Sequence, residues 1–339
     1  RERQKAEINP MQYGTIVHYI LERFFGEYTK EEYLSLEEDK FQKIVCAYLA
    51  EYAVKYFGEE QLESNSFTYR LKTILDNVMY LMKHIMEELS QSEFFVADCE
   101  LKIGEDIPSY TIVLPDGHKI AVCGSVDRVD IMQRADITYL RIIDYKTGTK
   151  QFKLSDILYG INLQMLLYLH SIEASGGDKY GEIVPAGILY MPATVPYISS
   201  DSLKSIDKLP DELNKKLKMN GLLLKDTEII HGMDKTDVAT YIPVKIKAGE
   251  PVSSTSLATL AEFGKIFKKV DMLIAEMGKN IYNGNIEAKP LKGGHDSCEY
   301  CPYDSVCAYR QSNPITCFSV DNKTVIEEIT NEINGKEEE

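Results

Sequence analysis

The chain has 339 residues, of which 44% are apolar and 27% charged, and its formal net charge is −15. A chain of this length and composition can bury a sizeable core. Because it has no uninterrupted apolar stretch long enough to span a bilayer, we expect a soluble globular protein that does not enter a membrane. The negative charge argues against tight binding to nucleic acid by this chain alone, since phosphate contacts supply most of that affinity. Seven cysteines, an odd number, and no apolar signal segment at the start favour a reducing cytoplasm.

The order of elements predicts an α/β protein in which helices come first and strands follow. Helices are expected at residues 10–27, 30–57 with a break, 65–90 and 153–173, and strands at 95–103, 109–114, 119–131, 138–146 and 186–191. After these come a polar insertion at 195–255, strand-like at 241–245, and a long amphipathic helix at 255–282.

We interpret residues 1–312 as one elaborated domain. Its parts are a helical region at 10–93, a catalytic sheet at 95–192, the insertion at 195–255, and the long helix with a cysteine segment at 255–310. Residues 313–339 are expected to form an acidic tail that is frayed from Thr324 onward.

Two aspartates and a lysine mark the candidate catalytic centre. Asp127 lies in one predicted strand, and Asp144 and Lys146 end the next strand. If the turn of this hairpin centres near Arg134, Asp127 lies nearly opposite Ile142, on the face that carries Asp144 and Lys146. Carboxylates can hold a divalent cation and an ammonium can steady the charge on water and phosphate. The alternative is a set of solvated charges at a sheet edge.

Four further residues are candidates for the same site. His18 falls off the apolar stripe of the first helix, on the side of Gly14, whose cost to helix stability suggests a close neighbour there. Gln164 and Tyr168 are four residues apart on a predicted helix and so share a face. Taken alone, His18 would more often face solvent, and Tyr168 would more often be half-buried beside a surface glutamine. Glu100 is a possible extra acidic group.

The cysteines divide into two groups. Metal-ligand spacing occurs in the motif His295-x-x-Cys298-x-x-Cys301-x5-Cys307. Both a zinc site with three cysteines and one histidine and part of an iron–sulfur site fit this spacing. The cysteines of the predicted helix and strands are expected to pack as small apolar residues; these are Cys46, Cys99 and Cys123.

In their order along the chain, these motifs resemble the RecB-type branch of the PD-(D/E)xK nuclease superfamily. The matching segments are Gly14-x-x-x-His18-x-x-x-Glu22, Gly124-Ser125-Val126-Asp127, Ile143-Asp144-Tyr145-Lys146 and Gln164-x-x-x-Tyr168. The cysteine segment makes the chain similar, over about residues 8–312, to the C-terminal nuclease domains of AddB (RexB) subunits of bacterial ATP-dependent helicase-nucleases. The resemblance implies a restriction-endonuclease-like α/β core, with a mixed central sheet flanked by helices.

The resemblance also implies roles for the candidate residues. Mg²⁺ or Mn²⁺ would be bound by His18, Asp127 and Asp144. Lys146 would position or activate the attacking water. The residues that would border the DNA are Gln164 and Tyr168.

The same resemblance implies a [4Fe–4S] cluster held by Cys298, Cys301 and Cys307 with a fourth cysteine upstream of the first helix. The sequence contains no such upstream cysteine. Since a cubane cluster needs four ligands, we expect the chain as given to hold an incomplete cluster.

The resulting hypothesis is a metal-dependent deoxyribonuclease that hydrolyses single-stranded DNA within a helicase-nuclease, beside a helicase subunit, and processes double-strand DNA ends for recombinational repair. One alternative is a catalytically silent DNA-binding or scaffold domain of the same complex. It is disfavoured because a decayed site has no physical reason to keep two carboxylates and a lysine. A redox or zinc module centred on the cysteine segment would leave the upstream motifs unexplained.

Overall fold

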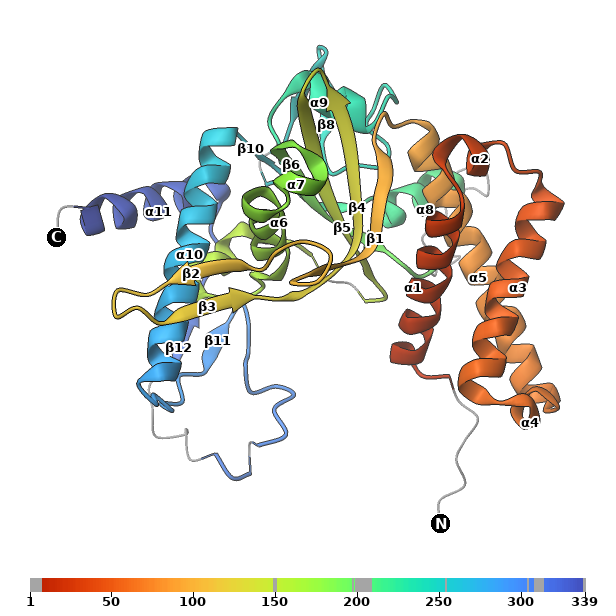
Figure 1. Cartoon of the computed structure of the whole chain (residues 1–339), viewed down its shortest axis with the longest axis horizontal. Coiled ribbons are helices and arrows are strands. Elements are labelled where there is room, and N and C mark those ends of the chain that lie inside the picture. Colours follow the sequence, from red (N-terminus) through yellow and green to blue (C-terminus); the bar gives the residue numbers. More distant parts are fainter. Residues whose placement is uncertain are drawn as a thin grey trace.

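The structure is a computed structural model that describes residues 8–148, 151–196, 198, 209–253, 255–303, 305–307 and 314–337. At its centre is a six-stranded mixed sheet in the order β1-β4-β5-β6-β7-β10 (Figure 1). Its strands are β1 (Phe95–Ile103), β4 (Gly124–Arg134), β5 (Ile137–Lys146), β6 (Glu182–Pro192), β7 (Asn220–Leu224) and β10 (Leu257–Ala258). β5 runs parallel to β6, whereas β4 is antiparallel to both of its neighbours.

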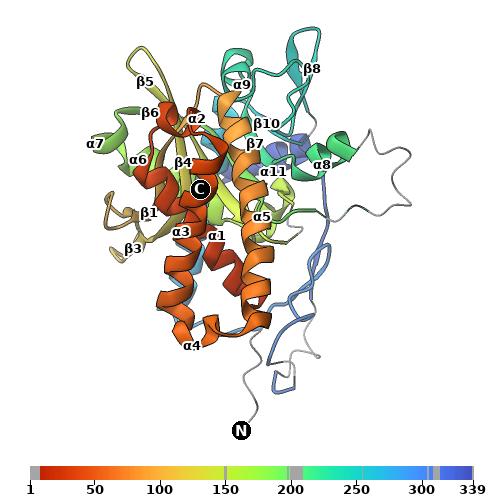
Figure 2. The same cartoon turned by 90° about the vertical axis from the view of Figure 1, so that its right-hand side faces the viewer.

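The N-terminal helices form a layer beside β1 (Figures 1 and 2). They are α1 (Pro10–Glu27), α2 (Lys30–Leu34), α3 (Glu38–Phe57), α4 (Glu59–Leu62) and α5 (Asn65–Ser90). α1 starts at Pro10 because Asn9 and Gln12 form a capping box and proline suits the first helical position. The predicted bounds of the first and third helices are confirmed, and the predicted break lies between α2 and α3.

A second group of helices contains the 3₁₀ helix η1 (Leu154–Tyr159) and the α-helices α6 (Gln164–Ser175), α7 (Gly177–Tyr180), α10 (Leu260–Tyr282) and α11 (Asn322–Glu337). It is built around α6, which packs on β6 and β5 of the sheet, with α10 packed on α6 and α11 on α10. The hairpin of β2 (Tyr110–Val113) and β3 (Lys119–Val122) crosses α10 and packs against it (Figure 1). No helix in the described part of the chain is long and apolar enough to cross a bilayer.

Two predicted elements are divided in the structure. The strand expected at 119–131 becomes β3 and β4, separated at Cys123, because β3 leaves the central sheet to pair with β2. The helix expected at 153–173 is interrupted before α6. Gly160 and Asn162 both adopt left-handed backbone angles there, with φ of 67° and 54°, and these end the 3₁₀ helix.

The segment expected to be an insertion supplies part of the central sheet. It contains α8 (Leu209–Leu217), β7, α9 (Thr227–Met233), β8 (Lys245–Lys247) and β9 (Glu250–Val252). β7 pairs with β6 through the fully buried Leu222 and Leu223, so this segment completes the core. The strand expected at 241–245 is wrong for its first four residues, since only Lys245 begins β8.

The C-terminal segments also differ from expectation. The long helix begins at Leu260, later than expected, because Thr259 caps it and forms a capping box with Glu262. The tail expected to fray forms α11, which packs on α10. Its apolar residues repeat every four positions, so they share one face and are buried; they are Val325, Ile329 and Ile333. Along the chain, two short strands come between α10 and α11 and pair with each other; they are β11 (Leu291–Gly293) and β12 (Ile315–Cys317).

Candidate active site

The register of the β4–β5 hairpin determines which site residues meet. The ladder pairs Val129 with Ile142, whereas the predicted pairing was Asp127 with Ile142. The register is shifted by two residues because the two-residue turn begins at Ala135. An even shift keeps every side chain on its predicted face. Continued by two residues, the register brings Asp127 opposite Asp144. The Asp127 carboxylate accepts a hydrogen bond of 2.9 Å from the backbone N–H of Tyr145.

Three ligand atoms converge where α1 crosses the ends of β1 and β4. His18 Nδ1 lies 2.9 Å from Glu100 Oε1, and His18 Nε2 lies 3.7 Å from Asp127 Oδ2. In the part of the chain that the structure describes, these three residues form the one group of histidine, cysteine and acidic side chains compact enough to hold a metal ion, with ligand atoms within 4.8 Å of one another.

Glu100 is held in this position by its backbone and by a neighbour. Its φ of 51° lies in the left-handed region, which is uncommon for a residue with a side chain and costs free energy. Ser125 Oγ donates a hydrogen bond of 2.9 Å to Glu100 Oε2. Glu100 therefore has a larger place in the site than sequence reasoning gave it. The sequence feature that could have indicated this role is the position of Glu100 in β1, but that position becomes informative only when the pairing of β1 with β4 is known.

The carboxylates and the imidazole perturb one another. Burial, together with the nearby charges of Asp144 and Glu100, raises the pKa of Asp127 to about 6, although His18 acts in the opposite direction. The hydrogen bond from His18 lowers the pKa of Glu100. Burial favours the neutral form of His18, but the hydrogen bond to Glu100 and the charges of the three carboxylates outweigh it and raise the pKa of His18.

Asp144 and Lys146 form an ion pair at the end of β5. Lys146 Nζ lies 2.5 Å from Asp144 Oδ2, and the Asp144 side chain is only 8% exposed. Asp144, one of the three predicted ligands, is not a member of the compact group, which contains Glu100 in addition to His18 and Asp127. The Asp144 charge is nevertheless near enough to raise the pKa values of His18 and Asp127.

Gln164 and Tyr168 lie in the first two turns of α6 and share a face as predicted, with 3.4 Å between Gln164 Nε2 and the Tyr168 hydroxyl. The Tyr168 hydroxyl lies against Gly124, where a Cβ atom would come within 2.3 Å of it. This contact explains glycine at the start of β4. The close neighbour expected at Gly14 is Thr147, but its distance of 3.7 Å to a Cβ at Gly14 is an ordinary contact.

A buried network of charges lies behind the site. Arg128 donates to both carboxylate oxygens of Asp130 at 2.7 Å, and Arg141 donates to Glu88 on α5 at 2.6 Å. These four side chains are completely buried. Although burial alone would raise the pKa of Asp130, the two arginines lower it. Sequence reasoning missed this network, because charged residues in strands are usually exposed.

The network also reaches the candidate metal-binding group of His18, Glu100 and Asp127. Arg128 Nη1 donates to the Tyr145 hydroxyl at 3.3 Å, and the Tyr145 ring packs edge-on against His18 with 5.7 Å between ring centroids. Tyr145 thus connects the buried charges with the imidazole.

The cysteine segment lies beyond α10, and its cysteines do not form a compact ligand group in the described residues. Cys298, Cys301 and Cys307 are partly exposed free thiols. The expectation that other cysteines are packed inside is wrong for the exposed Cys46 and Cys123, because Cys46 lies on the outer side of α3 and Cys123 in the link between β3 and β4. Burial raises the pKa of Cys99 to about 12, which suits the expected packing role of that residue.

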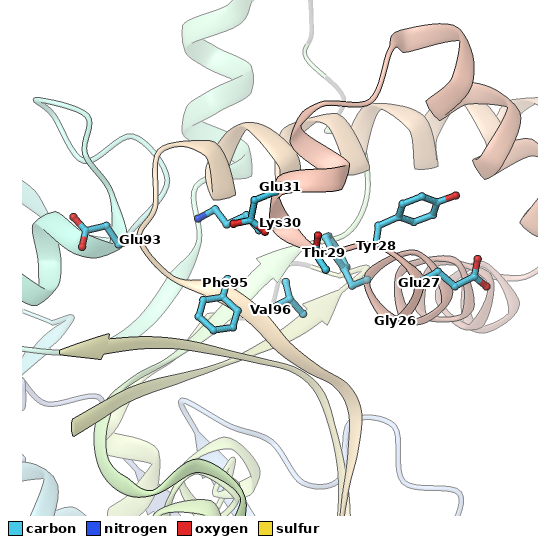
Figure 3. A pocket seen from close by; sticks show the side chains of 10 residues that line it. Gly26, Glu27, Tyr28, Thr29, Lys30, Glu31, Glu93, Phe95 and Val96 are labelled. Carbon is cyan, nitrogen blue, oxygen red and sulfur yellow. The ribbon is translucent and has the colours of Figure 1, made fainter. Parts of the chain in front are cut away.

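A separate pocket of about 700 Å³ lies between the end of α1, α2 and the start of β1 (Figure 3). It is lined by residues such as Phe25, Lys30 and Phe95. The Lys30 ammonium donates to the backbone oxygens of Ser92 and Phe94, at 2.6 and 2.8 Å, and so joins the helical layer to β1. None of the predicted site residues lines this pocket.

The site thus combines a histidine from α1, acidic residues near the ends of adjacent strands, and a lysine two residues after an aspartate. In a comparison of the sequence with protein families, the model of the PD-(D/E)XK nuclease superfamily matches residues 1–308. The chain belongs to this superfamily.

Curated relatives make the comparison more specific. The chain is 34% identical over 321 residues to an ATP-dependent helicase/deoxyribonuclease subunit from Thermoanaerobacter sp. (strain X514), covering 91% of this chain and 28% of the relative. Proteins of the same name from Alkaliphilus oremlandii (strain OhILAs) and Clostridium kluyveri (strain NBRC 12016) are 32% and 33% identical, covering 98% and 100% of this chain. The chain spans 30% of the length of each of these two relatives.

Proposed function

We propose that this chain is the nuclease domain of a helicase-nuclease subunit and that it hydrolyses phosphodiester bonds of single-stranded DNA with Mg²⁺ or Mn²⁺. The observation that carries the proposal is the convergence of His18, Glu100 and Asp127 beside the Asp144–Lys146 pair. The names of the relatives, which include both helicase and deoxyribonuclease, support a role in processing DNA ends beside a helicase subunit.

The donor set fits a divalent cation. Two carboxylates and one imidazole suit Mn²⁺, and the oxygen donors also suit Mg²⁺. The raised pKa of Asp127 reflects negative charge gathered in a partly buried place, where a bound cation would favour the ionised carboxylate. Asp144 is one residue from Tyr145, whose N–H holds the Asp127 carboxylate, so we keep it as a further candidate ligand.

The residues of the chain would divide the reaction between them. A bound cation would supply positive charge at the phosphate and favour deprotonation of the attacking water. His18, Glu100 and Asp127 would hold it in place. The Lys146 ammonium, held by Asp144, would orient water or stabilise the charge that develops on the phosphate. Gln164 and Tyr168 would border the DNA at the start of α6.

We further propose that residues 1–312 form one nuclease domain. A continuous core that reaches from Ile16 in α1 to Phe263 in α10 supports this reading. Because α11 adds Ile329 to the same core, we propose that this helix also belongs to the domain, beyond the expected boundary at residue 312. We keep the proposal that Cys298, Cys301 and Cys307 bind an iron–sulfur cluster together with a ligand from outside this segment, and that the protein works in a reducing cytoplasm.

Cleavage of end-labelled single-stranded DNA, with Mg²⁺, with Mn²⁺ and with EDTA, tests the proposal. We expect cleavage with either metal and none with EDTA. Asp127→Asn should reduce the rate by at least about a thousandfold, since a lost ligand removes several kcal/mol of transition-state stabilisation. Asp136→Asn, in the exposed β4–β5 turn, is the matched control and should cleave at the parental rate.

Lys146→Met separates the role of the lysine from that of the ligands. It should be nearly inactive, yet calorimetry should find its Mn²⁺ affinity undiminished, because the change removes a positive charge from the site. A parental protein that binds DNA but does not cut it with either metal would support the catalytically silent scaffold instead.

A further inference from the structure

A groove leads from the metal-binding group outward between α1 and α3. It has a volume of about 670 Å³, and both His18 and Glu100 line its inner end. Figures 1 and 2 show α1 and α3 side by side. Towards the outer end the lining is aromatic and apolar; it includes Met11, Tyr19, Tyr52 and Tyr56. The groove is therefore continuous with the site at which DNA would be cut.

The tyrosines form a continuous row of rings. Tyr19 follows His18 on α1, and its ring centroid lies 5.2 Å from that of Tyr52. Tyr52 and Tyr56 are four residues apart on α3, with 4.4 Å between ring centroids and an angle of 35° between ring planes. Tyr52 is 5% exposed and Tyr56 is 55% exposed, so the buried ring supports the exposed one. A large aromatic surface is thereby offered to solvent.

The row is fixed in place at its inner end. The Tyr19 hydroxyl donates a hydrogen bond of 2.8 Å to Glu51, which also accepts one from Arg23 at 3.0 Å. At the outer end, the Lys55 ammonium lies 5.1 Å from the centroid of the Tyr56 ring. Lys55 and Tyr56 are both exposed side chains of α3, and this ammonium can turn to a neighbouring phosphate when a flat ring covers Tyr56.

We propose that this tyrosine groove binds the bases of single-stranded DNA by stacking, chiefly on Tyr56 and Tyr19, and so guides the strand to or from the metal-binding group. The inference rests on the proposed nuclease function and names the part of the substrate that is recognised. Stacking on aromatic side chains tolerates any base sequence, and paired bases within a duplex are not available for it. The groove therefore selects single strands.

The charges around the groove agree with recognition of bases. Glu22 lines it and Glu51 lies beside Tyr19, so phosphates would be repelled from its floor. Uncharged bases can face the tyrosines while the phosphates point outward, towards Lys55 and Lys102.

Fluorescence anisotropy in EDTA and at low ionic strength tests the inference without any cleavage. Two labelled probes of equal length are compared, a thymidine oligonucleotide and a chain of abasic sites with the same number of phosphates. The parental protein should bind the thymidine probe more tightly. Tyr56→Ala should reduce affinity for that probe by about tenfold and leave the abasic probe unaffected, since one stacked base contributes on this order.

Two variants control for other effects. Tyr56→Phe keeps the ring and should bind as the parental protein does. Tyr69→Ala removes an exposed tyrosine of α5 that does not line the groove, and should also leave binding unchanged. Circular dichroism confirms that each variant is folded.

Equal affinity of the parental protein for both probes, or parental affinity of folded Tyr56→Ala for thymidine, overturns the groove proposal. Neither result touches the proposed nuclease function, which fails separately if Asp127→Asn still cleaves DNA.

Discussion

At the scale of single residues, the arrangement around His18 is the most informative feature. The imidazole contacts Glu100 and Asp127 from opposite ring nitrogens, at 2.9 and 3.7 Å. A ring nitrogen that binds a metal ion cannot at the same time share a proton with a carboxylate. Metal binding would therefore require His18 to be neutral and to release at least one of these contacts. We propose that these three side chains hold one another in place until a cation replaces those contacts.

We expect Glu100→Gln to weaken Mn²⁺ binding, because it removes one of the two carboxylates of the compact group. The loss should be about tenfold or more in affinity, measured by calorimetry at constant pH. Glu105→Gln, which alters an exposed residue near the end of β1, is the control. If Glu100→Gln binds Mn²⁺ normally and Asp144→Asn does not, Asp144 is the ligand, as the sequence first suggested.

At the scale of elements, α6 is positioned by contacts of its second turn. Tyr168 lies against Gly124, and His170 contacts Tyr110 of β2 and Asp271 of α10. These contacts link the residues proposed to border DNA with segments far away in the sequence.

Gly124→Ala should destabilise the fold, because the new methyl group would lie 2.3 Å from the Tyr168 hydroxyl. Overpacking of this kind costs about 1–3 kcal/mol. The double variant Gly124→Ala with Tyr168→Ala should recover part of that stability, which a double-mutant cycle of urea unfolding measures. Additive effects of the two changes would show that the tyrosine moves aside freely.

His170 should make stability depend on pH. Its ring lies 3.2 Å from both the Tyr110 hydroxyl and the Asp271 carboxylate. Burial favours the neutral ring, but Asp271 and Glu173 outweigh it and raise the pKa of His170 to about 9. A pKa raised above its unfolded value of about 6.5 stabilises the fold fully below that pH, and this contribution is lost as pH rises through about 9.

The melting temperature should therefore fall between pH 6 and pH 9 more in the parental protein than in His170→Gln. The lost contribution is on the order of 1–3 kcal/mol. His231→Gln changes a partly exposed position of α9. Its melting temperature should fall with pH as much as that of the parental protein. Identical pH profiles for the parental protein and His170→Gln would contradict the proposed role of the ion pairs.

At the scale of the whole molecule, one core joins the N-terminal helices, the sheet and the C-terminal helices. α11 belongs to it through Val325 and Ile329, both completely buried, and through an ion pair of 2.5 Å between Lys269 and Glu332. Ile329→Ala should thus cost about 2–5 kcal/mol in chemical unfolding, whereas Asn331→Ala, at an exposed position, should cost little. If Ile329→Ala is as stable as the parental protein, the C-terminal tail is frayed, as the sequence predicted.

Local patterns predicted much of the fold, and long-range pairing accounts for what they missed. Apolar periodicity predicted the bounds of α1 and α5, and β-branched runs predicted β1 and the β4–β5 hairpin. The register of that hairpin was wrong by two residues, but its faces were right. The part played by Glu100 and the sheet role of β7 depend on pairing between segments far apart in sequence, which no local pattern contains. The tail looked disordered because its composition is acidic, although its apolar spacing was helical.

The buried charges of Glu88, Arg128, Asp130 and Arg141 have a consequence for how the molecule opens. If α5 moved away from the sheet, both arginines would lose Glu88 and keep Asp130 alone, and breaking buried ion pairs of this kind costs several kcal/mol. Separation of α5 alone from the sheet is thus less favourable than cooperative unfolding of α5 and the sheet together. We expect the backbone amides of α5, β4 and β5 to exchange hydrogen with one common opening free energy, so that the candidate metal-binding group rests on the part of the protein that is last to open.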